Sequence, residues 1–257
     1  MLGLNEFYSL LEFAKYKPQR GVGIAVGAIM FLLFVFRYEL FGDLIFALMI
    51  PFIVSIFFVE LYRDEPNPFV NIALTLVGIF YIVLPFALWV NYLCPYATTH
   101  NKYVDQLIDS FLPNSNYNPK IVLGYFFILW TNDTGAYLTG MSIGKRKLWE
   151  RVSPKKTWEG FFGGVILSIA VAYLISRYFK ELSPLLWMIM GLLISVFGTF
   201  GDLVESLFKR SIDVKESGGL LPGHGGILDR FDGVLLSTPI VLTFVQIAEF
   251  VSNMVNG

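Results

Sequence analysis

Two aspartates close a glycine-rich stretch, "PGHGGILDRFDG", at residues 222 to 233. Asp229 and Asp232 are three residues apart, so both would lie on one face if a helix begins near residue 227. Carboxylates bind hard cations such as Mg²⁺, and glycines let backbone amides approach a phosphate closely. The spacing is not that of a Walker loop, but the combination favours magnesium and nucleotide chemistry. The glycines concerned are Gly218, Gly219, Gly223, Gly225 and Gly226.

His224 lies inside the same stretch and is one of two histidines in the chain. It has no cysteine or second histidine nearby, so it gives poor support for zinc, which usually takes several nitrogen or sulfur ligands. Phosphate nucleophiles are already ionised at neutral pH. We therefore expect His224 to order the loop or contact a phosphate rather than to act as a general base.

A second polar group precedes this stretch, in "GTFGDLVESLFKR" at residues 198 to 210. Asp202, Glu205, Ser206 and Lys209 are spaced three and four apart, which aligns them on one helix face. Together with Arg210, this face could hold a metal ion and a phosphate. Ion pairing along a solvated helix end is the alternative interpretation.

Asp133 interrupts a third, otherwise apolar stretch, "WTNDTGAYLTG" at residues 130 to 140. An ionisable group within a membrane helix is costly, so it generally faces the bundle interior or a wet cavity. We expect Asp133 to line a substrate cavity. A polar clamp between close-packed helices is the alternative.

The fourth group is the basic loop "GKRKLWERVSPKKTWEG", at residues 144 to 160. Ser153 could cap a helix whose first turn holds Pro154, and Lys155 and Lys156 would then bind phosphate near the helix amino terminus. A basic loop beside a bilayer also serves as a topology signal or an anchor for anionic lipids. Both interpretations remain open at this point.

The elements that position these groups are membrane helices. Of the 257 residues, 55% are hydrophobic and only 15% are charged, against roughly 25% charged in soluble domains. The net charge of −1 gives no indication of nucleic-acid binding. Cys94 is the single cysteine, so it cannot form an internal disulfide, and we expect a core or lipid-facing position for it.

Seven apolar runs are long enough to cross a bilayer as helices. An all-α, polytopic integral membrane protein with a polar cavity open to the cytoplasmic side is expected. The opening stretch, with apolar residues at helical spacing and a basic end, predicts a short interfacial helix. The predicted spans are residues 21 to 37, 42 to 61, 69 to 93, 119 to 140, 158 to 178, 184 to 206 and 233 to 252.

Most of the 19 lysines and arginines fall on one side of the membrane if the amino terminus is cytoplasmic. The positive-inside rule then places the loops 141 to 157 and 207 to 232 in the cytoplasm. Both charge-rich loops are thus predicted to face the same compartment.

Residues 206 to 232 resemble the signature of the phosphatidate cytidylyltransferase family of integral membrane enzymes. The resemblance extends over at least residues 131 to 233, whereas the amino-terminal part matches in hydrophobic character and in "EFYSLLEFAKYKP". Glu216 departs from the family pattern, which has Asp there. The "EFY" stretch also begins at residue 6, so a helical hairpin that precedes it in the family is expected to be missing. The matching residues are Ser206, Lys209, Arg210, Lys215, Gly218, His224, Gly225, Gly226, Asp229, Arg230 and Asp232.

The resemblance implies transfer of the cytidylyl group of CTP to phosphatidic acid, giving CDP-diacylglycerol and pyrophosphate in the cell membrane of a bacterium. It implies one or two Mg²⁺ ions held by Asp202, Asp229 and Asp232, with Lys209 as a further catalytic group. A homodimer is among the assemblies that it allows. Residues 1 to 118 would form amino-terminal membrane helices and residues 119 to 257 the catalytic region. The implied substrate-binding residues are Asp133, Lys155, Lys156, Ser206, Arg210, Lys215, His224, Gly225, Gly226 and Arg230.

Two alternatives differ in chemistry. A related CTP-dependent lipid enzyme or a polyprenol kinase would use the same polar groups. A cation-coupled transporter would also place acids within helices, but transporters often show internal repeats and polar sites near the midplane. This chain shows no evident repeat and gathers its charge on one face, which favours an enzyme.

Overall fold

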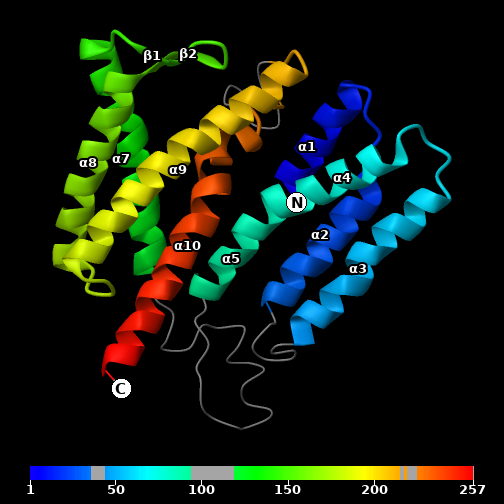
Figure 1. Cartoon of the computed structure of the whole chain (residues 1–257), viewed down its shortest axis with the longest axis horizontal. Coiled ribbons are helices and arrows are strands. Elements are labelled where there is room, and N and C mark those ends of the chain that lie inside the picture. The colour runs from blue at the N-terminus through cyan, green and yellow to red at the C-terminus, as the bar shows by residue number, and fades with distance from the viewer. Residues whose placement is uncertain (36–43, 94–118, 215–216, 219–224, 257) are drawn as a thin grey trace.

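The computed structural model describes residues 1–35, 44–93, 119–214, 217–218 and 225–256. Within these ranges the chain is almost entirely helical, as the all-α prediction requires (Figure 1). The elements are α1 (Leu2–Phe13), α2 (Arg20–Val35), α3 (Leu44–Leu61), α4 (Pro68–Gly78), the π-helical turn η2 (Ile79–Val83), α5 (Leu84–Leu93), α7 (Lys120–Ile143), β1 (Lys147–Trp149), β2 (Ser153–Thr157), α8 (Trp158–Tyr178), α9 (Pro184–Ser211) and α10 (Leu228–Asn256).

Among the residues that the structure describes, five helical segments are long and apolar enough to cross a bilayer. The protein is therefore a multi-pass membrane protein. The described part of each of the seven predicted spans is helical, but α2 as described is shorter than the other spans and α7 carries polar residues in its second half. The span number of seven stays a prediction. The five segments are Leu44–Leu61, Pro68–Trp89, Trp158–Tyr178, Pro184–Ser211 and Leu228–Ala248.

Two groups of helices stand side by side, and α10 lies between them (Figure 1). The first group joins α1, α2, α3 and the continuous α4–η2–α5 rod around buried residues such as Tyr8 and Ile79. The second joins α7, α8 and α9 around Tyr125 and Trp187. Because α10 packs against α5 on one side and α9 on the other, its first turn is held from both groups. The predicted division at residue 118 stays a prediction.

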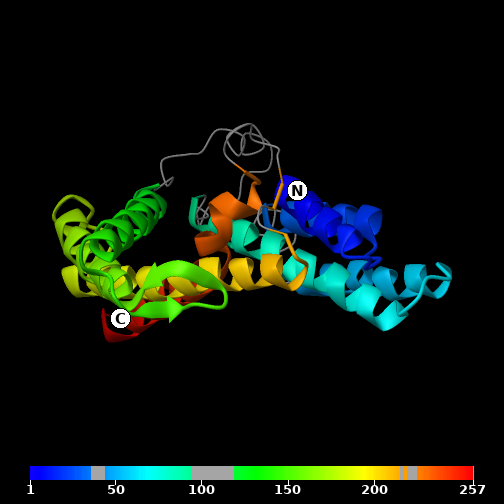
Figure 2. The same cartoon turned by 90° about the horizontal axis from the view of Figure 1, so that it is seen from above.

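The polar loops gather at one end of the helices. The β1–β2 hairpin, the carboxyl end of α9 and the amino end of α10 all lie at the upper end in Figure 1. Seen from above in Figure 2, the hairpin runs alongside α9. The described parts of the two loops that the charge pattern placed in one compartment thus share one end of the molecule, while the compartment itself stays a prediction.

The prediction of a helix capped at Ser153 is wrong. Residues Ser153–Thr157 form strand β2, which pairs antiparallel with β1, and Pro154 is tolerated because a two-stranded sheet has only edge strands. Helix α8 begins at Trp158, where the Thr157 hydroxyl accepts a hydrogen bond from the Gly160 amide at 3.1 Å. The two lysines therefore lie on a strand.

A close helix crossing brings the carboxyl half of α9 against the first turn of α10. A Cβ atom on Gly201 would lie 2.5 Å from the Asp232 carbonyl oxygen, closer than two such atoms can approach. Glycine is therefore required at this crossing. The backbone contact sets Asp202, the next residue of α9, beside the start of α10.

Candidate active site

An open cluster of charged side chains forms where the hairpin meets α9. The Lys156 ammonium lies 2.5 Å from Asp202 Oδ2, and the Ser206 hydroxyl donates to Asp202 Oδ1 at 3.2 Å. The Lys156 and Asp202 side chains are 26% and 37% exposed, so a water-soluble ligand can reach them. An ion pair this accessible contributes little to stability, which leaves its partners available for other contacts.

Two further carboxylates belong to this cluster. Asp232 and Asp202 are close enough for their negative charges to repel each other. Asp133 on α7 is exposed, and the charges of Lys156 and Asp202 both act on it. Asp232 Oδ1 accepts a hydrogen bond from the adjacent Gly233 amide at 2.6 Å. We call Asp133, Lys156, Asp202 and Asp232 the open cluster. It joins residues from α7, β2, α9 and α10.

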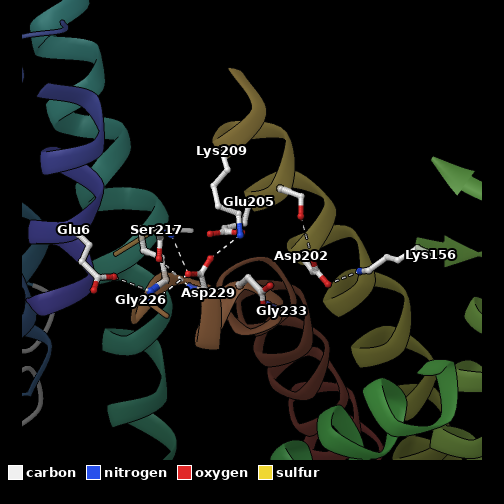
Figure 3. A network of polar contacts seen from close by, with 12 residues as sticks. Glu6, Lys156, Asp202, Glu205, Lys209, Ser217, Gly226, Asp229 and Gly233 are labelled. Atoms are coloured by element: carbon white, nitrogen blue, oxygen red, sulfur yellow. Dashed lines mark hydrogen bonds and ion pairs between the residues drawn. The ribbon is translucent and has the colours of Figure 1, made fainter. Parts of the chain in front are cut away.

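Asp229, one turn before Asp232, lies in a different environment. Its Oδ1 receives the Lys209 ammonium at 2.6 Å, and its Oδ2 accepts from the amides of Ser217 and Gly226 at 2.9 and 3.1 Å. The Ser217 hydroxyl in turn accepts from the Asp229 amide at 3.3 Å. In Figure 3, Asp229 lies between the loop residues and Lys209, while Asp202 and Lys156 meet farther along α9. Asp229 therefore ties the glycine-rich loop to α9.

Lys209 bridges two carboxylates. Its ammonium lies 2.6 Å from Glu205 Oε2 as well as from Asp229 Oδ1. The Lys209, Asp229 and Glu205 side chains are only 13%, 17% and 2% exposed, so these contacts act with little screening by solvent. We call Glu205, Lys209, Ser217, Gly226 and Asp229 the closed cluster.

The amino end of α10 is capped from the other end of the chain. Glu6 on α1 is buried, and its Oε2 accepts from the amides of Ile227 and Leu228 at 2.7 and 3.1 Å (Figure 3). A carboxylate suits this position because the first amides of a helix lack partners and carry partial positive charge. A Cβ atom on Gly226 would lie 2.0 Å from Ser217 Oγ and 2.8 Å from Glu6 Oε2, so only glycine fits there.

The structure brings most of the predicted site residues together, but not all of them. Lys156 reaches Asp202, whereas Lys155 is exposed and, as its neighbour on a strand, points to the opposite face. Arg210 and Arg230 are exposed, and Gly225 has a positive φ of 79° beside Asp229. Six residues named in the predictions lie outside the described residues: Cys94, Lys215, Glu216, Gly219, Gly223 and His224.

Two residues of the closed cluster, Glu205 and Ser217, were not predicted as site residues, and neither was Glu6, which caps the start of α10. Glu205 was placed on the correct helix face, but nothing in its spacing showed that it would be buried against Lys209. Glu6 opens the "EFY" stretch that matched the family, which is the one sequence signal that pointed toward it.

The carboxylates of the open cluster are of the kind that binds Mg²⁺, and a magnesium ion there stays a prediction. Within the described ranges, no three His, Cys, Asp or Glu side chains come together as a ready metal site. Mg²⁺ does not need one, since it keeps several waters and is usually bound by one or two carboxylates plus substrate phosphates. Asp202 and Asp232 supply hard oxygen donors at the required number.

Comparisons with known proteins identify the family of the chain. A model of the cytidylyltransferase family matches residues 1–248. Phosphatidate cytidylyltransferase of Staphylococcus epidermidis is 49% identical over 124 residues, which cover 48% of this chain and 47% of that protein. The enzyme of that name from Staphylococcus aureus strain COL is 51% identical over 122 residues, or 47% and 46% of the two chains.

The Bacillus subtilis protein with the same name is 49% identical over 115 residues, which cover 44% of this chain and 43% of that protein. The chain thus spans about half the length of the curated relatives that it matches. The family model, in contrast, runs from α1 through most of α10 and so includes both clusters. On this match, the chain belongs to the cytidylyltransferase family.

Proposed function

We propose that this protein transfers the cytidylyl group of CTP to phosphatidic acid, forming CDP-diacylglycerol and pyrophosphate. The observation that carries the proposal is the 2.5 Å contact between Lys156 and Asp202. It joins the basic hairpin to the acidic end of α9 at one end of a membrane protein. Groups that bind phosphate and groups that bind a cation therefore meet where a lipid head group and a soluble nucleotide can both arrive.

The reaction is a displacement at phosphorus. A phosphate oxygen of the lipid forms a bond to the α-phosphorus of CTP, the bond between that phosphorus and the oxygen bridging to the β-phosphate breaks, and pyrophosphate leaves. The attacking phosphate is already ionised near neutral pH, so the site needs no strong base. What it must supply is positioning and neutralisation of the charge that four phosphate groups bring together.

The open cluster supplies these functions. Asp202 and Asp232 would hold one or two Mg²⁺ ions, which when bound polarise the α-phosphate and neutralise the leaving group. Lys156 would exchange its contact with Asp202 for a phosphate oxygen, and Asp133 would line the cavity on the α7 side. Arg210 and Arg230 are exposed near the same end and could contribute further positive charge.

The closed cluster would hold the glycine-rich loop and the first turn of α10 against α9. Asp229 was predicted as a metal ligand. A carboxylate has about four acceptor sites, and three hydrogen bonds already engage Asp229. Lys209 is similarly engaged by two carboxylates. We therefore propose that Asp229 and Lys209 act mainly by ordering the glycine-rich loop, with direct metal or phosphate contacts made by the open cluster.

We further propose that the end of the molecule carrying the hairpin faces the cytoplasm, where CTP is available. Glu150 is exposed between the two strands, so Glu150→Cys in a Cys94→Ser background provides a single reporter thiol. Labelling by an impermeant thiol reagent only from the cytoplasmic side is expected. Labelling from outside intact cells would invert the topology. The homodimer and the lack of nucleic-acid binding stay predictions.

The position of a radioactive phosphate tests the activity most sharply. Purified protein is incubated with phosphatidic acid, Mg²⁺ and CTP labelled at either the α- or the γ-phosphorus. Cytidylyl transfer predicts that only the α-label enters the lipid fraction. Entry of the γ-label would indicate a kinase instead, and no transfer of either label would refute the proposal. In the same assay, Asp64→Asn is the matched control for substitution of a site aspartate, because Asp64 is an exposed carboxylate in the turn between α3 and α4.

A further inference from the structure

A π-helical turn interrupts the rod formed by α4 and α5. The Leu84 amide donates to the Ile79 carbonyl, five residues earlier, in place of the usual four. Pro85 accounts for the irregularity, because it has no amide hydrogen and its ring would clash with the carbonyl of Tyr81 in a regular helix. Such turns are rare and frequently occur at functional sites.

Tyr81 lies at the centre of this turn and directs its side chain into the protein. Its ring packs 6.4 Å from the Phe7 ring of α1, measured between centroids. Its hydroxyl is buried and has no hydrogen-bond partner among the residues that the structure describes. Buried tyrosine hydroxyls usually find a partner, since leaving a donor unsatisfied costs free energy. The unsatisfied hydroxyl therefore calls for an explanation.

The surroundings of the hydroxyl suggest what it binds. The Phe7 ring that contacts Tyr81 also packs against Phe208 of α9, with centroids 5.0 Å apart, next to Lys209 of the closed cluster. The charges of Glu205 on α9 and Asp232 on α10 both act on the hydroxyl. The adjoining Phe86 of α5 meets Phe231 of α10 edge to face, with centroids 5.3 Å apart, which fixes this rod against the first turn of α10. Within the described residues the hydroxyl is hydrogen-bonded to neither carboxylate, so it can donate to an oxygen atom of a ligand.

We propose that Tyr81 is a substrate-binding residue, whose hydroxyl donates a hydrogen bond to a phosphate oxygen of CTP or of phosphatidic acid. The proposal rests on the proposed function and deepens it. It gives the amino-terminal helices a direct part in the site, in addition to the capping contact of Glu6. CTP and phosphatidic acid both present phosphate oxygens, and the KM for each substrate tells which of the two Tyr81 binds.

The test compares two tyrosines that differ in their hydrogen bonds. Tyr81→Phe removes an unsatisfied hydroxyl, so the melting temperature of the purified protein should stay constant or rise. The KM for CTP or for phosphatidic acid should increase about tenfold or more, as for loss of a hydrogen bond to a charged group. The substrate whose KM rises identifies the phosphate.

Tyr8→Phe is the matched control, because the Tyr8 hydroxyl donates to the Thr75 carbonyl at 2.7 Å within the first core. We expect a lower melting temperature and unchanged KM values for both substrates. The two substitutions remove the same atom from the same group of helices. A lower melting temperature is expected only for Tyr8→Phe, and a higher KM only for Tyr81→Phe.

Several outcomes would overturn the assignment. Unchanged KM values in an active Tyr81→Phe enzyme would remove Tyr81 from the substrate site, as would a change in kcat alone. A lower melting temperature together with altered kinetics would indicate a structural role. If the wild-type protein transfers no label from CTP, the proposed function fails and this proposal fails with it, whereas an active wild type isolates the Tyr81 question.

Discussion

The open and closed clusters share one helical turn of α10 but differ in how their carboxylates are occupied. Asp229 is held by an ammonium and two backbone amides, and its side chain is 17% exposed. Asp232, three residues later, accepts a hydrogen bond from its own neighbouring amide, and the charge of Asp202 acts on it. Two aspartates of one short motif can therefore serve different purposes, one ordering the loop and the other meeting the ligand.

The difference follows from what each carboxylate must neutralise. In the closed cluster, Lys209 balances carboxylates that are shielded from solvent, and removing one partner would leave a poorly compensated charge. In the open cluster, Asp133, Asp202 and Asp232 lie around Lys156, whose ammonium contacts Asp202. An excess of negative charge near the surface favours a divalent cation. The predictions below test this division.

The largest expected effect is that of Asp232→Asn. The side-chain amide is a much poorer magnesium ligand, and loss of metal stabilisation worth about 4 kcal/mol would lower kcat by about a thousandfold. The melting temperature should change little, because Asp232 does not tie the loop to α9. A variant with wild-type turnover would remove Asp232 from the metal site, and Asp64→Asn controls for the loss of one negative charge.

Asp229→Asn should lower both activity and stability. One amide oxygen cannot replace the two carboxylate oxygens that receive Lys209, Ser217 and Gly226, so we expect a loss of about 2 kcal/mol in unfolding free energy. Turnover should fall about a hundredfold through disorder of the loop, a loss of roughly 2.7 kcal/mol. Thermal unfolding followed by tryptophan fluorescence, together with kcat, measures both. Normal stability with deep loss of turnover would instead favour direct metal binding by Asp229.

Adjacent lysines sharpen the comparison at a smaller scale. Lys156→Gln should raise the KM for CTP about tenfold, as expected for loss of one charge-assisted contact with phosphate. Lys155→Gln should have little effect, because its side chain points away from Asp202 on the strand. Equal effects of the two substitutions would mean that the hairpin acts through its overall positive charge rather than through one side chain.

The smallest expected effect is that of Glu6→Gln. The amide retains one acceptor for Ile227 and Leu228 but loses the charge that favours a helix amino terminus, at a cost of about 1 kcal/mol. Hydrogen exchange at those two amides should accelerate. Glu12→Gln on the same helix breaks only the partly exposed contact with Arg20 and should leave that exchange unchanged. Equal protection in both variants would contradict the capping role.

Much of the fold could be predicted from the sequence because hydrophobic length is a direct signal of membrane helices. The alignment of Asp202, Ser206, Glu205 and Lys209 also followed from spacing alone. Helix α10 begins at Leu228, five residues before the predicted span and close to the start at residue 227 that would align Asp229 and Asp232. The helix predicted from Ser153 failed because Ser and Pro suit strand edges and turns as well as helix starts. Only the pairing with β1 decides between them.

The division of the site could not be predicted. Asp229 and Asp232 look equivalent in the sequence, and what separates them is a set of backbone amides and a lysine brought together by folding. Glu6 lies far from α10 in the chain, so its capping contact is a tertiary effect without a local pattern. Pro85 gave a hint of an irregular helix, but not of the direction in which Tyr81 would point.

The central claim is that the metal belongs to the open cluster, and direct metal binding tests it independently of turnover. Mn²⁺ replaces Mg²⁺, and electron paramagnetic resonance of the free ion gives the dissociation constant in the presence of CTP. Asp232→Asn should weaken Mn²⁺ binding more than tenfold, while Asp229→Asn leaves it within about threefold of wild type. If Asp229→Asn weakens Mn²⁺ binding and Asp232→Asn binds Mn²⁺ as tightly as the wild type, the metal lies in the closed cluster and the account is contradicted.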